Sequence, residues 1–167
     1  VTVRGIDPSY LHMAIMKLRA MGCCVDAGDD WITCSRNQPL QPTDIQTLPH
    51  PGFPTDLQAQ FMLLCSLAHG TSMVTENVFE NRFMFASELA RMGADITIEY
   101  HHALVRGVND LQGTDVSSTD LRAGAALVLA GIVAEGETRV HNIRHIDRGY
   151  EDYCGKLSQL GANVSRR

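Results

Sequence analysis

The stretch Pro54-Thr55-Asp56-Leu57-Gln58-Ala59 recurs later in the chain as Ser118-Thr119-Asp120-Leu121-Arg122-Ala123. Each copy is followed by a largely apolar run that ends at a glycine, Gly70 or Gly136. A helix that is apolar on nearly every side after its first turn is expected to have protein around its whole circumference. The two copies therefore predict two central helices, and they reveal an internal repeat that sets the architecture.

The segments that follow these helices repeat as well. A β-rich run, Thr71 to Asn77 or Glu137 to Ile143, precedes an arginine that introduces an amphipathic segment. These segments end in similar Leu-to-Gly motifs at 89–94 and 157–162, and a third such ending lies at 18–23. Glycine at these places is typical of a helix C-terminus before a strand. The third ending closes a predicted amphipathic helix that Asp7 caps, with Pro8 at its first position and an apolar stripe of Leu11, Ile15, Leu18 and Met21.

Hairpins and a connector complete the expected organisation. Residues 24–27 and 31–34 predict one hairpin, and residues 96–100 and 103–106 predict another. Residues 35–54 carry five of the six prolines of the chain, which indicates a connector without regular structure. We therefore expect one α+β domain over residues 1–167, with a partial first unit (1–34), a connector (35–54), a second unit (55–106) and a third unit (119–167).

Composition excludes several classes of function. The chain has 167 residues, 44% of them apolar, and a net charge of -5 without a basic patch, so neither nucleic acid nor a membrane surface is an expected partner. The apolar run 123–134 is well short of the roughly 20 residues that a membrane span needs. No secretion signal opens the chain, and a cytoplasmic location is the expectation.

The cysteines and histidines do not predict a reactive or metal site. The five cysteines are odd in number and lack paired C-x-x-C spacing, which favours reduced, structural thiols. Cys23 and Cys24 are interpreted as packing residues at a helix-to-strand junction. The seven histidines lie in unrelated contexts, and we expect no metal ligands among them.

Asp56 is the first candidate for chemistry. The proline-rich segment 50–56 delivers its carboxylate to the start of a buried helix. In one interpretation Asp56 or Thr55 caps the helix, the role that Thr119 or Asp120 fills in the repeat. In the other, the carboxylate accepts a proton from a substrate hydroxyl. The two roles do not exclude each other.

Three arginines are candidates for binding an anion. Arg122 is the only charge on its predicted helix, so we expect it to pair with a carboxylate such as Asp120 or to reach an anionic ligand. Arg82 and Arg148 are predicted at the openings of helices, where backbone N–H groups favour anions. The alternative is that both are surface arginines, paired with nearby carboxylates: Glu80, Glu88, Asp147 or Glu151.

Four strings of the chain closely resemble the UDP-N-acetylglucosamine enolpyruvyl transferases: His50 to Phe61, Phe79 to Phe83, Thr119 to Ala123, and His145 to Tyr150. The resemblance covers nearly the whole chain and marks it as a carboxy-terminal portion. It implies a two-domain enzyme in which each domain has three βαβαββ units with helices enclosed by sheets, an inside-out α/β barrel. It also implies transfer of enolpyruvyl from phosphoenolpyruvate to the 3'-hydroxyl of UDP-N-acetylglucosamine, the first committed step of peptidoglycan precursor synthesis, with no metal or other cofactor.

The resemblance also implies roles for individual residues. Asp56 matches the base that faces the sugar hydroxyl, and Arg148 matches the arginine on the phosphoenolpyruvate anion. Asp120 and Arg122 match a motif that lines the cleft and helps domain closure, while Val78 and Phe79 match contacts to the uridine nucleotide.

The family's cysteine-bearing loop, with its lysine and further arginines, has no counterpart in this sequence. This chain is therefore expected to need the amino-terminal domain of the same enzyme and to be inactive alone.

Two alternatives stay open on the sequence. A binding module could keep the fold, bind a nucleotide sugar and lack catalysis, although intact Asp56, Arg122 and Arg148 weigh against it. Another enzyme of the same architecture, such as an RNA 3'-phosphate cyclase, would call for a basic strand-binding face, which the acidic balance disfavours.

Overall fold

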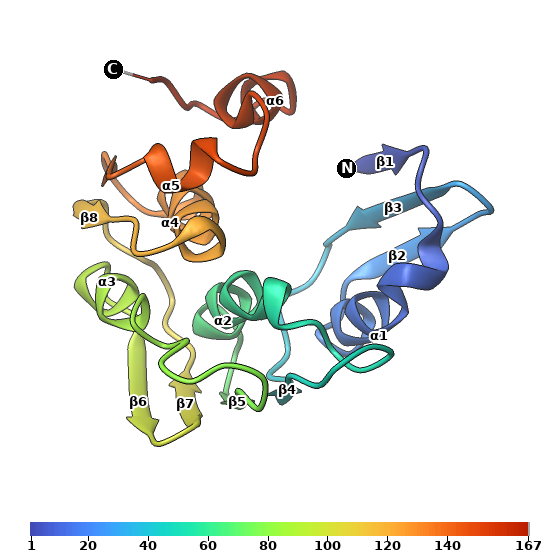
Figure 1. Cartoon of the computed structure of the whole chain (residues 1–167), viewed down its shortest axis with the longest axis horizontal. Coiled ribbons are helices and arrows are strands. Elements are labelled where there is room, and N and C mark those ends of the chain that lie inside the picture. Colours follow the sequence, from blue (N-terminus) through green and yellow to red (C-terminus); the bar gives the residue numbers. More distant parts are fainter. Residues whose placement is uncertain (167) are drawn as a thin grey trace.

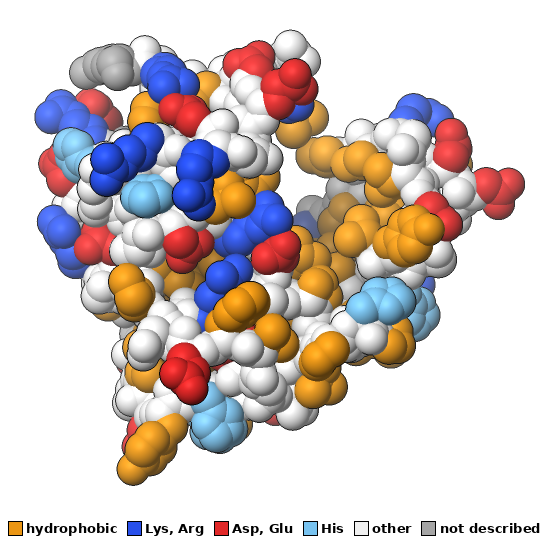
Figure 2. Space-filling model, in the orientation of Figure 1, with side chains coloured by type: hydrophobic (Ala, Val, Ile, Leu, Met, Phe, Trp, Pro, Cys, Tyr) orange, Lys and Arg blue, Asp and Glu red, His pale blue; other side chains and the backbone are white. Residues whose placement is uncertain are grey.

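Residues 1–166, which the computed structural model describes, form three small β-sheets with helices between them (Figure 1). A deep notch separates the part made by the first sheet from the part made by the last helices (Figures 1 and 2). The elements in chain order are β1 (Thr2–Arg4), the 3-10 helix η1 (Pro8–Leu11), α1 (His12–Ala20), β2 (Cys24–Ala27), β3 (Trp31–Ser35), β4 (Ile45–Gln46), the 3-10 helix η2 (Thr55–Leu57), α2 (Gln58–Ser66), β5 (Thr71–Thr75), α3 (Ala86–Arg91), β6 (Asp95–Glu99), β7 (His102–Arg106), β8 (Asp115–Ser117), α4 (Leu121–Val133), β9 (Arg139–His141), α5 (Arg144–Asp147) and α6 (Tyr153–Gln159).

The central sheet has the strand order β4-β5-β7-β6. Strands β4 and β5 are parallel, and β7 runs antiparallel to both β5 and β6. The β6–β7 pair is the hairpin predicted at 96–100 and 103–106, with its turn at Tyr100 and His101. Tyr100 adopts the left-handed conformation with φ of 55°, which closes the turn tightly.

The first sheet, β1-β3-β2, is antiparallel and contains the second predicted hairpin. The helical segment before this hairpin, η1 followed by α1, begins as predicted, because the Asp7 side chain accepts a hydrogen bond from the Ser9 backbone N–H. The helix ends before Gly22, whose φ of 87° suits the predicted glycine C-terminus. The apolar stripe starts later than predicted, because Leu11 is exposed and Ile15 is buried.

Helices α2 and α4 pack against each other in the centre of the fold (Figure 1). All residues of α2 except Gln60 and Leu64 are buried, as its apolar sequence predicts. In α4, residues 123–127 and Ala130 are buried. The expectation of complete enclosure is wrong for the last turn of α4, where Ile132 and Val133 are exposed. Within residues 1–166, the neighbouring sheet has only strands β8 and β9, which are too few to cover this turn.

The proline-rich segment 35–54 is more ordered than predicted. It contains β4, which pairs with β5, and its residues Leu40, Ile45 and Phe53 are buried in the core. Strand β8 likewise lies just before residue 119, the predicted start of the third unit. Strands of two and three residues are too short to show an alternating pattern, so the sequence did not reveal either one.

The predicted helix openings at Arg82 and Arg148 are wrong. Residues 80–85 form turns, and α3 begins only at Ala86. Arg148 follows the last residue of the short helix α5, and α6 begins at Tyr153 with Asp152 as its cap. Because neither arginine stands at a helix N-terminus, neither can gain an anion site from backbone N–H groups there.

All five cysteines are free thiols. Cys65 is fully buried and Cys23 packs partly against the core, as expected for structural residues. The packing interpretation is wrong for Cys24, which is exposed at the start of β2, while the next residue, Val25, is buried. Neighbouring side chains of a strand point to opposite faces, which accounts for the difference. In the described part of the chain no helix is long and apolar enough to cross a bilayer.

Candidate functional site

The carboxylate of Asp56 is held by two arginines from distant parts of the chain. Arg122 donates from Nη2 to Oδ2 at 2.7 Å, and Arg82 Nη2 lies 3.5 Å from Oδ1. Asp56 belongs to η2 at the start of α2, Arg122 to the first turn of α4, and Arg82 to the turns before α3. The side chain of Asp56 remains 54% exposed, so a ligand can still reach it.

The capping interpretation of Asp56 is wrong, and so is that of Thr55. No side chain caps η2 or α2, and the Thr55 hydroxyl donates to Glu76 instead. In the repeat, Asp120 does cap its helix: its Oδ1 accepts hydrogen bonds from the backbone N–H groups of Arg122 and Ala123 at 2.8 and 3.0 Å. The two aspartates therefore occupy matching sequence positions but make different contacts.

The partner of Arg122 depends on which of these two aspartates caps its helix. Arg122 pairs with a carboxylate, which is one of its two predicted roles, but the carboxylate is that of Asp56, because Asp120, the example named, binds the backbone of α4. The hydrogen bond to Asp56 raises the pKa of Arg122 above its usual value, and a hydrogen bond involving Tyr150 adds to the effect. The Arg122 guanidinium also lies 5.8 Å from the centroid of the Tyr150 ring. Arg122 is thus a fixed positive charge at this site.

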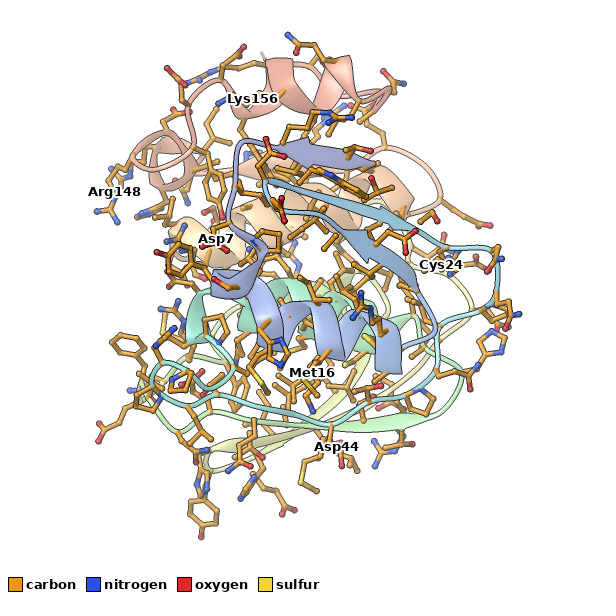
Figure 3. The ribbon with its side chains drawn as sticks, turned by 90° about the vertical axis from the view of Figure 1, so that its right-hand side faces the viewer. Asp7, Met16, Cys24, Asp44, Arg148 and Lys156 are labelled. Carbon is orange, nitrogen blue, oxygen red and sulfur yellow. The ribbon has the colours of Figure 1, made fainter. Side chains whose placement is uncertain are left out.

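Arg148 belongs to the segment that leads to Tyr150, the aromatic residue next to Arg122. Gly149 packs so closely on Leu121, the first residue of α4, that an added Cβ would lie 2.8 Å from its side chain. Arg148 itself is exposed and projects away from the body of the protein (Figure 3). The structure therefore brings the Arg148 segment to the N-terminus of α4, where Arg122 and Asp56 meet.

The surface-pair alternative for Arg148 is wrong within residues 1–166, because no carboxylate there pairs with it. Its expected partners are engaged elsewhere: Asp147 binds Arg166 at 2.7 Å, and Glu151 binds Lys156 at 3.3 Å. Arg148 is consequently a cation that an anionic ligand can approach from solvent.

Arg82 joins the Asp56 cluster to a groove. Its guanidinium lies 5.2 Å from the centroid of the Phe79 ring. The groove, with a volume of about 630 Å³, is lined by residues 76–84 and by Ile98, Tyr100 and His101. Val78 and Phe79 are 38% and 53% exposed on it. The predicted substrate contacts Val78, Phe79 and Arg82 therefore share one surface.

The face shown in Figure 2 places these chemical types together. Basic and acidic side chains touch near its centre, next to exposed apolar side chains. Exposed apolar groups beside a guanidinium suit a ligand that combines a flat ring with negative charge. A carboxylate beside them can accept a proton from a hydroxyl group. Among residues 1–166, no group of three or more His, Cys, Asp or Glu side chains could hold a metal ion.

Glu76 is a site residue that the sequence did not predict. It is only 3% exposed, and its carboxylate accepts hydrogen bonds from the hydroxyls of Thr47 and Thr55 and from the backbone N–H groups of Val78 and Phe79 in the groove wall. A buried carboxylate needs such partners because leaving water without them is costly. The available signal was an acidic residue directly after a β-rich run, three positions before the resembling string that begins at Phe79.

Comparisons with known proteins identify the family of this chain. Residues 1–157 match the family model of EPSP synthase (3-phosphoshikimate 1-carboxyvinyltransferase). The chain is 50% identical over 166 residues to a UDP-N-acetylglucosamine 1-carboxyvinyltransferase of Psychrobacter sp. (strain PRwf-1), covering 99% of this chain and 38% of that protein. It is 51% identical over 166 residues to the protein of the same name from Desulfofundulus thermocisternus, covering 99% of this chain and 68% of that protein.

Two solved structures are also similar. The crystal structure of the enolpyruvyl transferase NikO from Streptomyces tendae has a TM-score of 0.88 at 32% identity, covering 98% of this chain and 39% of that one. EPSP synthase from Acinetobacter baumannii has a TM-score of 0.73 at 19% identity, covering 99% of this chain and 42% of that one, a likeness of fold alone. The chain spans about 40% of the length of most of these relatives.

Proposed function

The chain belongs to the UDP-N-acetylglucosamine 1-carboxyvinyltransferases, within the EPSP synthase family, and from this membership we propose that the full-length protein transfers enolpyruvyl from phosphoenolpyruvate to UDP-N-acetylglucosamine. Phosphate is the other product, and the reaction opens peptidoglycan precursor synthesis in the cytoplasm. The observation that carries this proposal is the Asp56 carboxylate, exposed and held between Arg82 and Arg122.

The proposed architecture is one domain of an inside-out α/β barrel. The order β4, α2, β5, α3, β6, β7 supplies one βαβαββ unit, with β4 added before the predicted boundary at residue 55. The predicted first unit, 1–34, and third unit, 119–167, would contribute parts of two more, with β8 added to the third. The other domain of the enzyme closes over the face that carries Asp56.

Asp56 acts as the base in this proposal. It accepts the proton of the sugar 3'-hydroxyl while that oxygen bonds to the central carbon of phosphoenolpyruvate, and the methylene carbon gains a proton from an acid on the other domain. The resulting tetrahedral intermediate then loses phosphate and a proton to give the enolpyruvyl ether. Since an alcohol is too weakly acidic to ionise beforehand, the position of the carboxylate matters most. The two guanidinium groups support this role because they hold the carboxylate in place.

Arg148 and Arg122 have different roles in this proposal. Arg148 holds the carboxylate or phosphate of phosphoenolpyruvate, which its exposed and unpaired guanidinium suits. Arg122 aligns Asp56 from the first turn of α4, and Asp120 keeps that turn in place through its cap. Domain closure around substrate would then act on a prearranged cluster.

The groove holds the nucleotide part of UDP-N-acetylglucosamine. Val78 and Phe79 offer exposed apolar surface to the uracil ring, and Arg82 at the Asp56 end offers a positive charge to the diphosphate. This chain alone is expected to bind the nucleotide sugar weakly and to have no turnover, because the acid and the remaining anion ligands belong to the other domain.

The test is to assay phosphate release by the full-length enzyme from phosphoenolpyruvate with UDP-N-acetylglucosamine, with Asp56→Asn compared with the parent. Asn keeps the shape of the side chain but cannot accept the proton, so turnover should fall by about 100-fold or more. Asp95→Asn is the matched control, because Asp95 also pairs with an arginine on the surface, at 3.1 Å, but lies outside the site. A parent without activity, or an active Asp56→Asn enzyme, would overturn the proposal.

A further inference from the structure

The contacts of Glu76 divide between its two carboxylate oxygens. Oε1 accepts from the Thr47 hydroxyl at 2.8 Å and from the N–H groups of Val78 and Phe79 at 2.8 and 3.0 Å. Oε2 accepts from the Thr55 hydroxyl at 2.9 Å. Oε1 therefore joins the groove wall to Thr47, and Oε2 holds η2, the turn that carries Asp56.

The backbone around Glu76 is fixed as well. Its N–H donates to the His101 carbonyl at 2.8 Å, which ties it to the β6–β7 turn. The next residue, Asn77, donates from its backbone N–H to the Thr47 hydroxyl at 2.9 Å and from its side-chain amide to the Thr47 carbonyl at 3.1 Å. Glu76 is thus a fixed point on the central sheet from which two loops are held.

The side chain at this position supplies acceptors for four donors. An apolar side chain would fill the space without the cost of burying a carboxylate, but it could not receive donors from two separate loops. A fully satisfied polar network rigidifies the segments that it joins. At Glu76, those segments are the predicted nucleotide contacts and the turn with the predicted base.

We propose that Glu76 is a positioning residue that couples the groove wall at Val78 and Phe79 to the turn carrying Asp56. It sets the distance between the place where the nucleotide binds and the carboxylate that accepts the sugar proton. This inference rests on the proposed function. A misplacement of about 1 Å at a reacting group can lower the rate by about 100-fold, so the coupling has a measurable effect.

The experiment compares steady-state kinetics of full-length enzymes that carry Glu76→Ala, Glu76→Gln or Thr55→Val. Glu76→Ala releases both loops, so kcat should fall by about 100-fold and KM for UDP-N-acetylglucosamine should rise by about 10-fold. Thr55→Val releases only the Asp56 turn, so kcat should fall by about 10-fold while KM stays as in the parent. In Glu76→Gln, the amide oxygen can accept from the three donors that Oε1 now binds, and the amide nitrogen can donate to the Thr55 hydroxyl. This variant should therefore keep most of the activity that Glu76→Ala loses.

Two controls separate coupling from loss of stability. Ser72→Ala removes another buried hydrogen bond on β5, the one that the Ser72 hydroxyl accepts from the Thr43 N–H at 3.0 Å, and should lower Tm without changing KM or kcat. Since Glu76 and Thr55 share a bond, their effects on kcat should be non-additive in the double variant. If Glu76→Ala does not fold, Thr55→Val and Glu76→Gln still decide the question.

The results that would overturn the inference differ from those that would overturn the function. A parent enzyme that neither turns over nor binds UDP-N-acetylglucosamine in calorimetry contradicts the proposed function. An active parent in which Thr55→Val keeps the parental kcat contradicts the coupling. A Glu76→Gln enzyme as impaired as Glu76→Ala would also contradict it, because the loss would then follow from the charge and not from the position of the loops.

Discussion

Replacing Asp120 by alanine should cost more stability than replacing Asp56 by alanine. Asp120 accepts two backbone N–H groups at the start of α4, whereas Asp56 caps no helix. Loss of an N-cap costs about 0.5–2 kcal/mol of unfolding free energy. The partly exposed pairs of Asp56 are worth roughly 0–1 kcal/mol. For a chain of this size, each kcal/mol shifts Tm by about 2–4 °C.

Thermal and urea unfolding of this chain, followed by circular dichroism, measures the difference. Asp120→Ala should lower Tm by about 4–8 °C, near the upper end of the cap range because two donors lose their acceptor. Asp120→Asn keeps an acceptor for the cap and should stay close to the parent. Asp56→Ala should change Tm by no more than about 4 °C. A loss of Tm well above about 4 °C for Asp56→Ala would contradict the absence of a cap by Asp56.

Three further predictions concern other residues. Arg148→Lys should raise KM for phosphoenolpyruvate by about 10-fold in the full-length enzyme, since an ammonium cannot bind the anion through two bonds; an unchanged KM would remove Arg148 from the anion site. Burial raises the pKa of the Cys65 thiol from 9.0 to about 11, so the folded state favours the neutral thiol. The resulting contribution to stability is complete below pH 9 and is lost as the pH rises towards 11. The unfolding free energy should therefore fall over this range by roughly 2–3 kcal/mol more in the parent than in Cys65→Ala, and parallel pH profiles in urea unfolding would contradict this. Leu127→Ala should cost about 2–5 kcal/mol in urea unfolding, because Leu127 is fully buried between the central helices; a loss below about 1 kcal/mol would show that α4 is loosely packed.

The local features of the fold were predictable from the sequence. Gly22, Gly93 and Gly161 all have φ between 87° and 97°, and each follows a helix as the repeated Leu-to-Gly motif predicts. Both hairpins lie where alternation and turn residues placed them. These features depend on neighbours in the sequence, so pattern alone is enough to find them.

The long-range features were not predictable. A carboxylate partner for Arg122 was predictable, but its identity was not, since Asp56 lies 66 residues away. Asp120, the nearby example, is not the partner because its carboxylate accepts from the backbone N–H groups of its own helix. The groove and the role of Glu76 depend on contacts between segments at Thr47, Thr55 and Val78 that are far apart in the sequence. No repeating pattern of residues predicts these contacts.

The two aspartates at matching positions of the sequence repeat make different contacts. One copy keeps the carboxylate on the backbone, where any good N-cap residue would serve, so we expect saturation mutagenesis at position 120 to accept Asn or Ser. In the other copy the helix begins without a side-chain cap, and its carboxylate is released to the surface. The same sequence position therefore fixes the start of a helix in one copy, and in the other it leaves a carboxylate at the surface between two arginines.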